Sequence, residues 1–400
     1  MNLNELLSEQ HLAMKRSEIR ELLKLTSVPG MISFGGGLPD PSLFPLKRIQ
    51  DVTEQVIMED GVNALQYGTT EGDNGLRKIL VERYRKIGFK IGLENLIIVT
   101  GSQQALDLTG KIFVNPKDKI ICEAPSYLGS LGAFLSYGAD ICDIPIDNEG
   151  INMKELRECY ANLEREQQKP KYLYLIPDYQ NPSGIHMSLQ RRKEVIEFAR
   201  EKDLLLIEDS PYKEFNFEGE SLASLFELWE NGNVIHFGTF SKTFMPGLRL
   251  GWIIASEEII DRYVIAKQNT DLCSSPLNQK ICAKFIEQGY FDDYLKIVKI
   301  EYKKKRDAML KDFEEFMPKE VSWNSPNGGL FLFIRFPEGI DSKKLFDKAI
   351  EKRVAYVPGT AFFVGGKGKD FARINFSYSS IEQNREGVKR LAELIKSEIR

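Results

Sequence analysis

Short apolar runs alternate with amphipathic helical segments through most of the chain, and this alternation limits the possible folds more than any other feature. The runs NLIIVT (95–100), DKIICEAP (118–125), KYLYLIPD (171–178) and DLLLIED (203–209) are predicted strands, and the segment 188–203 has helical spacing. Buried strands joined by helices of this length form βαβ units, which build a largely parallel sheet with helices on both faces. The sequence therefore predicts an α/β fold.

The pattern changes toward both ends of the chain. Residues 14–26 have helical spacing and are expected to belong to an arm, whereas a long charged helix after about residue 285 leads into the apolar stretches 328–336 and 373–379. Helices followed by a few alternating strands favour a smaller α+β domain, and 400 residues exceed one ordinary domain. We therefore expect an N-terminal arm with part of the small domain (1–50), a large domain (51–285) and a C-terminal small domain (286–400).

Composition and charge argue against several classes of function. A formal net charge of −4 gives no electrostatic reason to expect nucleic-acid binding. No apolar run approaches the roughly 20 residues of a membrane span. The three histidines lie far apart, so we expect no histidine metal site and interpret each as structural or exposed. The five cysteines show no paired spacing, and we expect reduced thiols and a cytoplasmic location.

Polar residues follow several predicted strands, at the edge where open α/β sheets bind ligands. Ser102 and Gln103 begin the helix after the first strand. The free backbone amides of such a helix start can bind a phosphate, although serine also caps helices without any ligand. Tyr127, after the second strand, can stack on a planar ring or simply pack. Asn181 can donate to a ligand oxygen or close its own turn before Pro182.

Two cationic side chains and one carboxylate have mostly apolar sequence neighbours, which is typical of buried positions. The stretch GTFSKTFMPGLRLGW (238–252) places Lys242 among apolar neighbours, with Arg249 a short way beyond it. A buried ammonium without a partner is costly, so a solvated or ion-paired lysine is the ordinary expectation, and a lysine carrying a covalent cofactor is the alternative. Asp209 ends an apolar strand beside Glu208, where a carboxylate needs a cation or caps a helix.

The order of these pieces resembles that of the fold-type I pyridoxal-phosphate aminotransferases of class I/II. The pieces are SQQ (102–104), Tyr127, NPSG (181–184), DSPY (209–212) and SKTFMPGLR (241–249), with YGTTEG (67–72), SPNGGLFLF (325–333) and YVPGTAFF (356–363) extending the likeness over nearly the whole chain. Residues 17–45 and PGLRLGW (246–252) are similar to those of the 2-aminoadipate and kynurenine aminotransferase group. The resemblance implies reversible transfer of an amino group between an amino acid and a 2-oxo acid, and a homodimer with shared active sites.

The resemblance also implies roles around the cofactor, pyridoxal 5'-phosphate. Lys242 would be the Schiff-base lysine and Asp209 would pair with the pyridine nitrogen. Tyr127 would stack on the ring, while Asn181 and Tyr212 would donate to its phenolate oxygen. The groups implied for the phosphate are the side chains of Thr239, Ser241 and Arg249, the backbone amides of Ser102 and Gln103, and Tyr67 from the neighbouring subunit.

On the substrate side, the resemblance makes Arg373 the ligand of the α-carboxylate and Arg20 a group that can meet a distal carboxylate. Gly37 would border the pocket together with Asn181. A β-lyase or decarboxylase of the same fold is an alternative, because the cofactor residues are common to these enzymes. An aminotransferase-like transcription regulator is a second alternative, but it would need an additional winged-helix domain.

Overall fold

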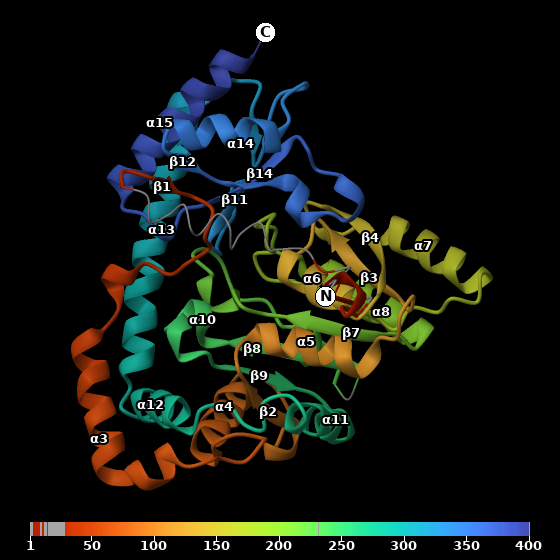
Figure 1. Cartoon of the computed structure of the whole chain (residues 1–400), viewed down its shortest axis with the longest axis vertical. Coiled ribbons are helices and arrows are strands. Elements are labelled where there is room, and N and C mark those ends of the chain that lie inside the picture. The colour runs from red at the N-terminus through yellow and green to blue at the C-terminus, as the bar shows by residue number, and fades with distance from the viewer. Residues whose placement is uncertain (1–2, 9, 12–13, 15–28, 231, 400) are drawn as a thin grey trace.

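The computed structural model describes residues 3–8, 10–11, 14, 29–230 and 232–399, and its largest sheet has eight strands within those ranges (Figure 1). The strand order is β2-β9-β8-β7-β6-β3-β4-β5. Strands β8, β7, β6, β3 and β4 run parallel, whereas β9 is antiparallel to both β2 and β8, and β5 is antiparallel to β4. This confirms the expected α/β fold. The bounds are β2 (Leu96–Val99), β3 (Lys119–Ala124), β4 (Asp140–Asp147), β5 (Gly150–Ile151), β6 (Tyr172–Leu175), β7 (Leu205–Asp209), β8 (Val234–Thr239) and β9 (Gly251–Ile254).

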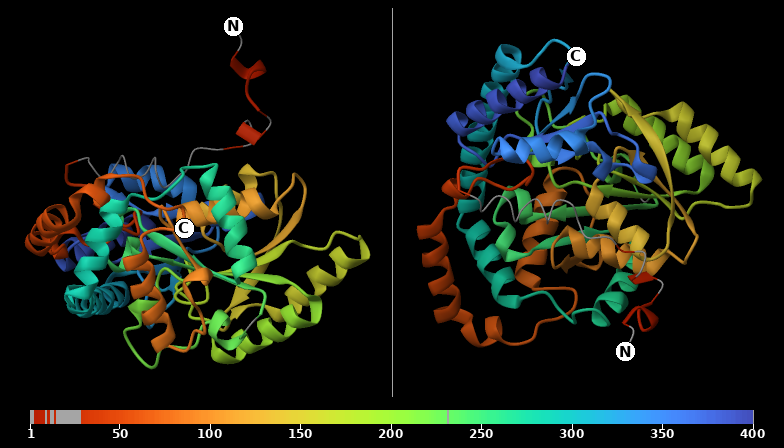
Figure 2. Two further views of the ribbon diagram at one scale, coloured as in Figure 1. Left: turned by 90° about the horizontal axis from the view of Figure 1, so that it is seen from below. Right: turned by 45° about the horizontal axis from the view of Figure 1, so that its top comes forward.

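Both faces of this sheet are buried beneath helices (Figures 1 and 2). Alternate residues of a strand point to opposite faces, so Tyr174 of β6 belongs to one core and its neighbour Leu173 to another. Leu106 of α5 packs into the first core and Val195 of α8 into the second. The helices of this part are α3 (Leu46–Leu65), α4 (Asn74–Lys86), α5 (Ser102–Phe113), α6 (Leu128–Ser136), α7 (Met153–Arg165), α8 (Leu189–Lys202), α9 (Leu225–Leu228), α10 (Phe240–Thr243), α11 (Glu257–Gln268) and α12 (Pro276–Glu287).

The C-terminal part contains an antiparallel sheet in the order β10-β11-β14-β13. Strand β1 pairs in parallel with β12, with Ile32 opposite Val354, so Ile32 and Ser33 lie on this part. The domain boundaries given above remain predictions. The elements are β1 (Ile32–Ser33), β10 (Ser322–Trp323), β11 (Phe331–Arg335), β12 (Val354–Ala355), β13 (Val357–Pro358), β14 (Phe371–Asn375), α13 (Tyr290–Phe316), α14 (Ser342–Glu351) and α15 (Ile381–Glu398). Short 3-10 helices are η1 (Leu3–Glu5), η2 (Pro41–Leu43), η3 (Leu93–Asn95), η4 (Lys213–Phe215), η5 (Pro246–Leu248), η6 (Gly359–Phe362) and η7 (Val364–Gly366).

One detail differs from the sequence-based expectation, and one predicted helix is confirmed together with its cap. The apolar stretch 373–379 is not one strand: β14 ends at Asn375, and Ser380 caps α15 by accepting a hydrogen bond from the backbone N–H of Gln383. The predicted helix after residue 188 is present as α8, where the Ser188 hydroxyl accepts from the backbone N–H of Arg191. None of the described helices combines the length and apolar content of a membrane span.

Candidate functional site

Lys242 lies directly beyond β8, on the short helix α10 that the Thr239 side chain caps. Its Nζ donates a hydrogen bond to the backbone oxygen of Gly37, 2.9 Å away. Burial lowers the pKa of Lys242 to about 8, and the charges of Arg373 and Arg249 act in the same direction. An amine with this pKa exchanges a proton readily near neutral pH, as a general base must.

Asp209 and Glu208 end β7 and point to opposite faces of the sheet. Glu208 accepts hydrogen bonds from the backbone N–H groups of Leu225 and Phe226 at the start of α9, so it fulfils the helix-capping alternative. Asp209 is 2% exposed; its Oδ2 accepts from the Tyr174 hydroxyl at 2.7 Å, and its Oδ1 is buried with no hydrogen-bond partner among the described residues. Burial raises the pKa of Asp209 to about 6. A buried oxygen of this kind fits a cationic donor from outside the chain.

Arg373, Asn181 and Tyr212 form a buried cluster next to Lys242. The Arg373 guanidinium donates to Asn181 Oδ1 at 2.8 Å and to the Gly35 oxygen at 2.6 Å, while the Asn181 amide donates to the Tyr212 hydroxyl at 3.3 Å. Burial lowers the pKa of Arg373 to about 10, and its Nε has no hydrogen-bond partner among the described residues. A planar guanidinium with an unpartnered Nε–H suits a carboxylate.

A second polar cradle lies where α5 begins. Gly101 precedes this helix with φ +79°, and a Cβ there would come within 2.6 Å of Arg249 Nη2. The Ser102 hydroxyl is buried without a hydrogen-bond partner, and Arg249 forms no ion pair with a carboxylate of the described residues. Arg249 contacts the Ser241 hydroxyl at 3.5 Å, and Thr239 donates to the same oxygen at 3.1 Å. Helix-terminal amides, two hydroxyls and an uncompensated guanidinium fit a phosphate.

The remaining predicted residues are placed in three different ways. Tyr127 is half-buried and lies close enough to Arg373 and Tyr212 to affect their pKa values, so it belongs to the cluster. Gln103 is exposed and donates to the Gly129 oxygen at 3.1 Å. Tyr67 is 79% exposed and lines a surface hollow of about 620 Å³ together with Pro276 and Lys280, outside the cluster. Arg20 and most of the predicted helix at 14–26 lie outside the described residues.

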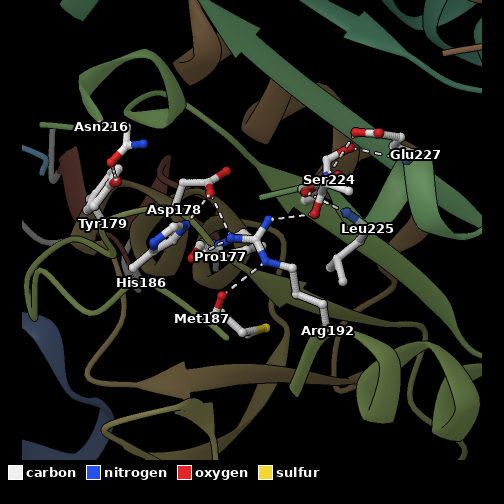
Figure 3. A network of polar contacts seen from close by, with 12 residues as sticks. Pro177, Asp178, Tyr179, His186, Met187, Arg192, Asn216, Ser224, Leu225 and Glu227 are labelled. Atoms are coloured by element: carbon white, nitrogen blue, oxygen red, sulfur yellow. Dashed lines mark hydrogen bonds and ion pairs between the residues drawn. The ribbon is translucent and has the colours of Figure 1, made fainter. Parts of the chain in front are cut away.

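A buried ion pair holds the loop that presents Asn181. Arg192 of α8 donates to Asp178 Oδ1 at 2.7 Å and to the backbone oxygens of Pro177 and Met187, which fixes both ends of the loop (Figure 3). His186 bonds to the same carboxylate oxygen at 3.1 Å, which confirms a structural role for that histidine. Burial alone would raise the pKa of Asp178, but the Arg192 charge and the His186 hydrogen bond hold it well below its usual range.

Sequence reasoning missed Tyr174, Asp178 and Arg192. Tyr174 lies inside a strand that looks uniformly apolar, and Arg192 lies in a helix in which charged residues are ordinarily solvated. The one available indication was the run PDYQNPSG, where the carboxylate of Asp178 stands four residues after Tyr174 without an evident partner.

Known proteins share both the sequence and the architecture. The chain matches the family model described as aminotransferase class I and II over residues 32–391. An aromatic-amino-acid aminotransferase of Thermococcus litoralis is 46% identical over 394 residues, covering 98% of this chain and 94% of that protein. A 2-aminoadipate transaminase of Thermus thermophilus is 40% identical over 383 residues, covering 95% of this chain and 94% of that protein. The crystal structure of Pyrococcus horikoshii kynurenine aminotransferase in complex with PMP has a TM-score of 0.95 and 42% identity, covering 100% of this chain and 99% of that chain.

Proposed function

Since this chain belongs to the class I and II aminotransferases and is a pyridoxal-phosphate-dependent transaminase, we propose that glutamate and 2-oxoglutarate form one of its substrate pairs. We place 2-aminoadipate, aromatic or branched-chain amino acids in the other pair. One observation carries the assignment of the site: Lys242 and Arg373 donate to the backbone oxygens of Gly37 and Gly35, so a base and a carboxylate ligand stand side by side.

We assign the cofactor-binding roles as follows. Pyridoxal phosphate supplies an electron sink when it is bound. Asp209 holds a proton on the pyridine nitrogen through Oδ1, and its buried, unpaired oxygen supports this role. Tyr212 and Asn181 orient the ring by donating to its phenolate oxygen, and Tyr127 stacks on the ring. The phosphate is bound by Arg249 and Ser241, with Thr239 and the amides of Ser102 and Gln103 as further donors.

Lys242 moves the proton in the chemical step. With a pKa of about 8, roughly a quarter of the amine is neutral at pH 7.5. The neutral Nζ takes a proton from the α-carbon of the amino acid, and the neighbouring positive charges of Arg373 and Arg249 keep the amine from holding its proton too tightly. Arg373 fixes the α-carboxylate, so the α-carbon lies within reach of Lys242.

The second subunit completes the site in this proposal. Helix α3 exposes Met58 (80%), Val62 (86%) and Leu65 (71%), and Tyr67 follows it with 79% exposure. Apolar side chains so exposed along one helix support a homodimer, in which Tyr67 reaches the phosphate site of the other subunit. The five free cysteines support a cytoplasmic location.

A substrate panel tests the proposal. Initial rates with 2-oxoglutarate as the acceptor are measured for 2-aminoadipate, aromatic and branched-chain amino acids, using wild type, Lys242→Ala and Arg20→Ala. We expect Lys242→Ala to lose turnover with every donor, because it removes the base. We expect Arg20→Ala to raise KM for 2-aminoadipate more than for aromatic donors. Equal losses for both donor classes would reject the role of Arg20, and full activity of Lys242→Ala would reject the site.

A further inference from the structure

Asp209 is bound by a hydroxyl group to which the assignments above give no function. Tyr174 of β6 donates to Asp209 Oδ2 at 2.7 Å. The strand pairing makes this contact: Tyr174 lies opposite Ile207 of β7, and Asp209, two residues further on, points to the same face. The hydrogen bond therefore depends on the register of two neighbouring strands in the middle of the sheet.

The Tyr174 ring cannot turn away from this contact. It is fully buried, and the ring of Phe134 from α6 packs edge-on against it, with centroids 5.5 Å apart and planes at 75°. Burial and the nearby Asp209 charge raise the pKa of Tyr174 well above its ordinary value, so the phenol keeps its proton. A phenol that keeps its proton and has a carboxylate as neighbour acts as the donor of the pair.

We propose that Tyr174 is a positioning residue of the transamination site, whose hydroxyl holds the Asp209 carboxylate charged and in one orientation, with Oδ1 left for the pyridine nitrogen. The inference rests on the assignment of Asp209 to that nitrogen in the proposed function. A hydrogen bond to a carboxylate favours its charged form, whereas burial favours the protonated acid. A protonated Asp209 would not keep a proton on the ring nitrogen, and the electron sink would weaken.

Other titratable groups also surround Asp209. The charge of Lys242 on α10 acts to lower the pKa of Asp209. Burial and the Asp209 charge raise the pKa of Tyr212, which lies beyond β7. Tyr127, at the start of α6, interacts with Tyr174. These groups are the same in a Tyr174→Phe variant, so the difference between that variant and wild type isolates the one hydroxyl.

The same strand offers a matched control. Tyr172 lies two residues before Tyr174 on the same face, and its ring also packs on Phe134, with centroids 5.3 Å apart. Its hydroxyl is buried and has no hydrogen-bond partner among the described residues. Tyr172→Phe therefore removes a buried hydroxyl from the same surroundings without touching Asp209.

The test is the dissociation constant of pyridoxal phosphate for the full-length apoprotein at pH 6, 7.5 and 9, measured by fluorescence titration. We expect Tyr174→Phe to weaken binding about 10-fold at pH 7.5, in line with the loss of a hydrogen bond to a charged group. The loss should be larger at pH 6 and smaller at pH 9, because Asp209 is charged in both proteins at high pH. Tyr172→Phe should stay within about twofold of wild type at all three pH values.

A double variant distinguishes an effect through Asp209 from a general loss of packing around the site. If Tyr174 acts through Asp209, adding Tyr174→Phe to Asp209→Asn should not weaken binding further. A Tyr174→Phe loss that is the same at every pH, or that persists in the Asp209→Asn background, would overturn the inference. If wild type and Tyr174→Phe bind pyridoxal phosphate equally well, the inference is also overturned, but the proposed function stays intact. Wild type without any affinity for pyridoxal phosphate would refute both.

Discussion

Replacing Asp209 by asparagine should stabilise the cofactor-free protein while it ruins the site. Burial raises the pKa of Asp209 from its ordinary 3.8 to about 6, so folding favours the protonated acid. The carboxylate therefore costs stability as pH rises from about 4 to about 6, and the full cost is present above that range. At about 1.4 kcal/mol per tenfold change in proton affinity, the cost at pH 8 is about 3 kcal/mol, and it is about half as large at pH 5.

Urea unfolding of the apoprotein at pH 5 and pH 8 measures this difference. Asp209→Asn should raise the free energy of unfolding by up to about 3 kcal/mol at pH 8 and by clearly less at pH 5, and it should weaken pyridoxal-phosphate binding at both. Asp178→Asn is the matched control, because Asp178 is also buried but is paired with Arg192 at 2.7 Å. Breaking that pair should destabilise the protein by about 3 kcal/mol or more. A lower unfolding free energy for Asp209→Asn at pH 8 would refute the reasoning.

Further predictions concern the cations and the phosphate cradle. Because burial lowers the pKa of Lys242 to about 8, its charged form costs stability below that pH. Lys242→Met should therefore stabilise the apoprotein more at pH 6 than at pH 9, which is the opposite pH trend to that of Asp209→Asn. The same pH trend for both variants in urea unfolding would contradict this. Arg373→Lys should raise KM for 2-oxoglutarate about 100-fold in steady-state assays, because an ammonium cannot bind a carboxylate through two parallel hydrogen bonds. A KM within about twofold of wild type would reject Arg373 as the carboxylate ligand. Gly101→Ala should weaken pyridoxal-phosphate binding at least about 10-fold in equilibrium dialysis, since its Cβ would lie 2.6 Å from Arg249 Nη2. Gly132→Ala is the control, because its Cβ would meet nothing within 4 Å. Equal pyridoxal-phosphate affinities of the two variants would argue against the cradle.

The residues at strand ends could be predicted because topology brings them together. Asp209 ends the parallel strand β7 and Lys242 follows the parallel strand β8, and the carboxyl ends of these strands meet at one edge of the sheet. Strand β9 was not predicted: its four residues follow Arg249, which adopts a left-handed conformation at φ 55°, and no alternation of apolar and polar residues marks them.

Contacts that depend on register or on long-range pairing could not be derived from the sequence. Tyr174 looks like a core residue in KYLYLIPD, and only its pairing opposite Ile207 brings its hydroxyl to Asp209. Arg192 is one of two adjacent arginines in α8. Which of them turns inward toward Asp178 is decided by the packing of that helix on the sheet, because neighbouring helical positions point about 100° apart.

The most direct test of the account is the visible absorption spectrum of the protein loaded with pyridoxal phosphate, recorded before and after excess glutamate is added without an acceptor. The visible band of the lysine-bound cofactor should disappear with glutamate and return when 2-oxoglutarate is added. Lys242→Ala should show neither change. A wild-type band that persists with glutamate and with every other amino acid of the panel would contradict a transaminase built around Lys242, Asp209 and Arg373.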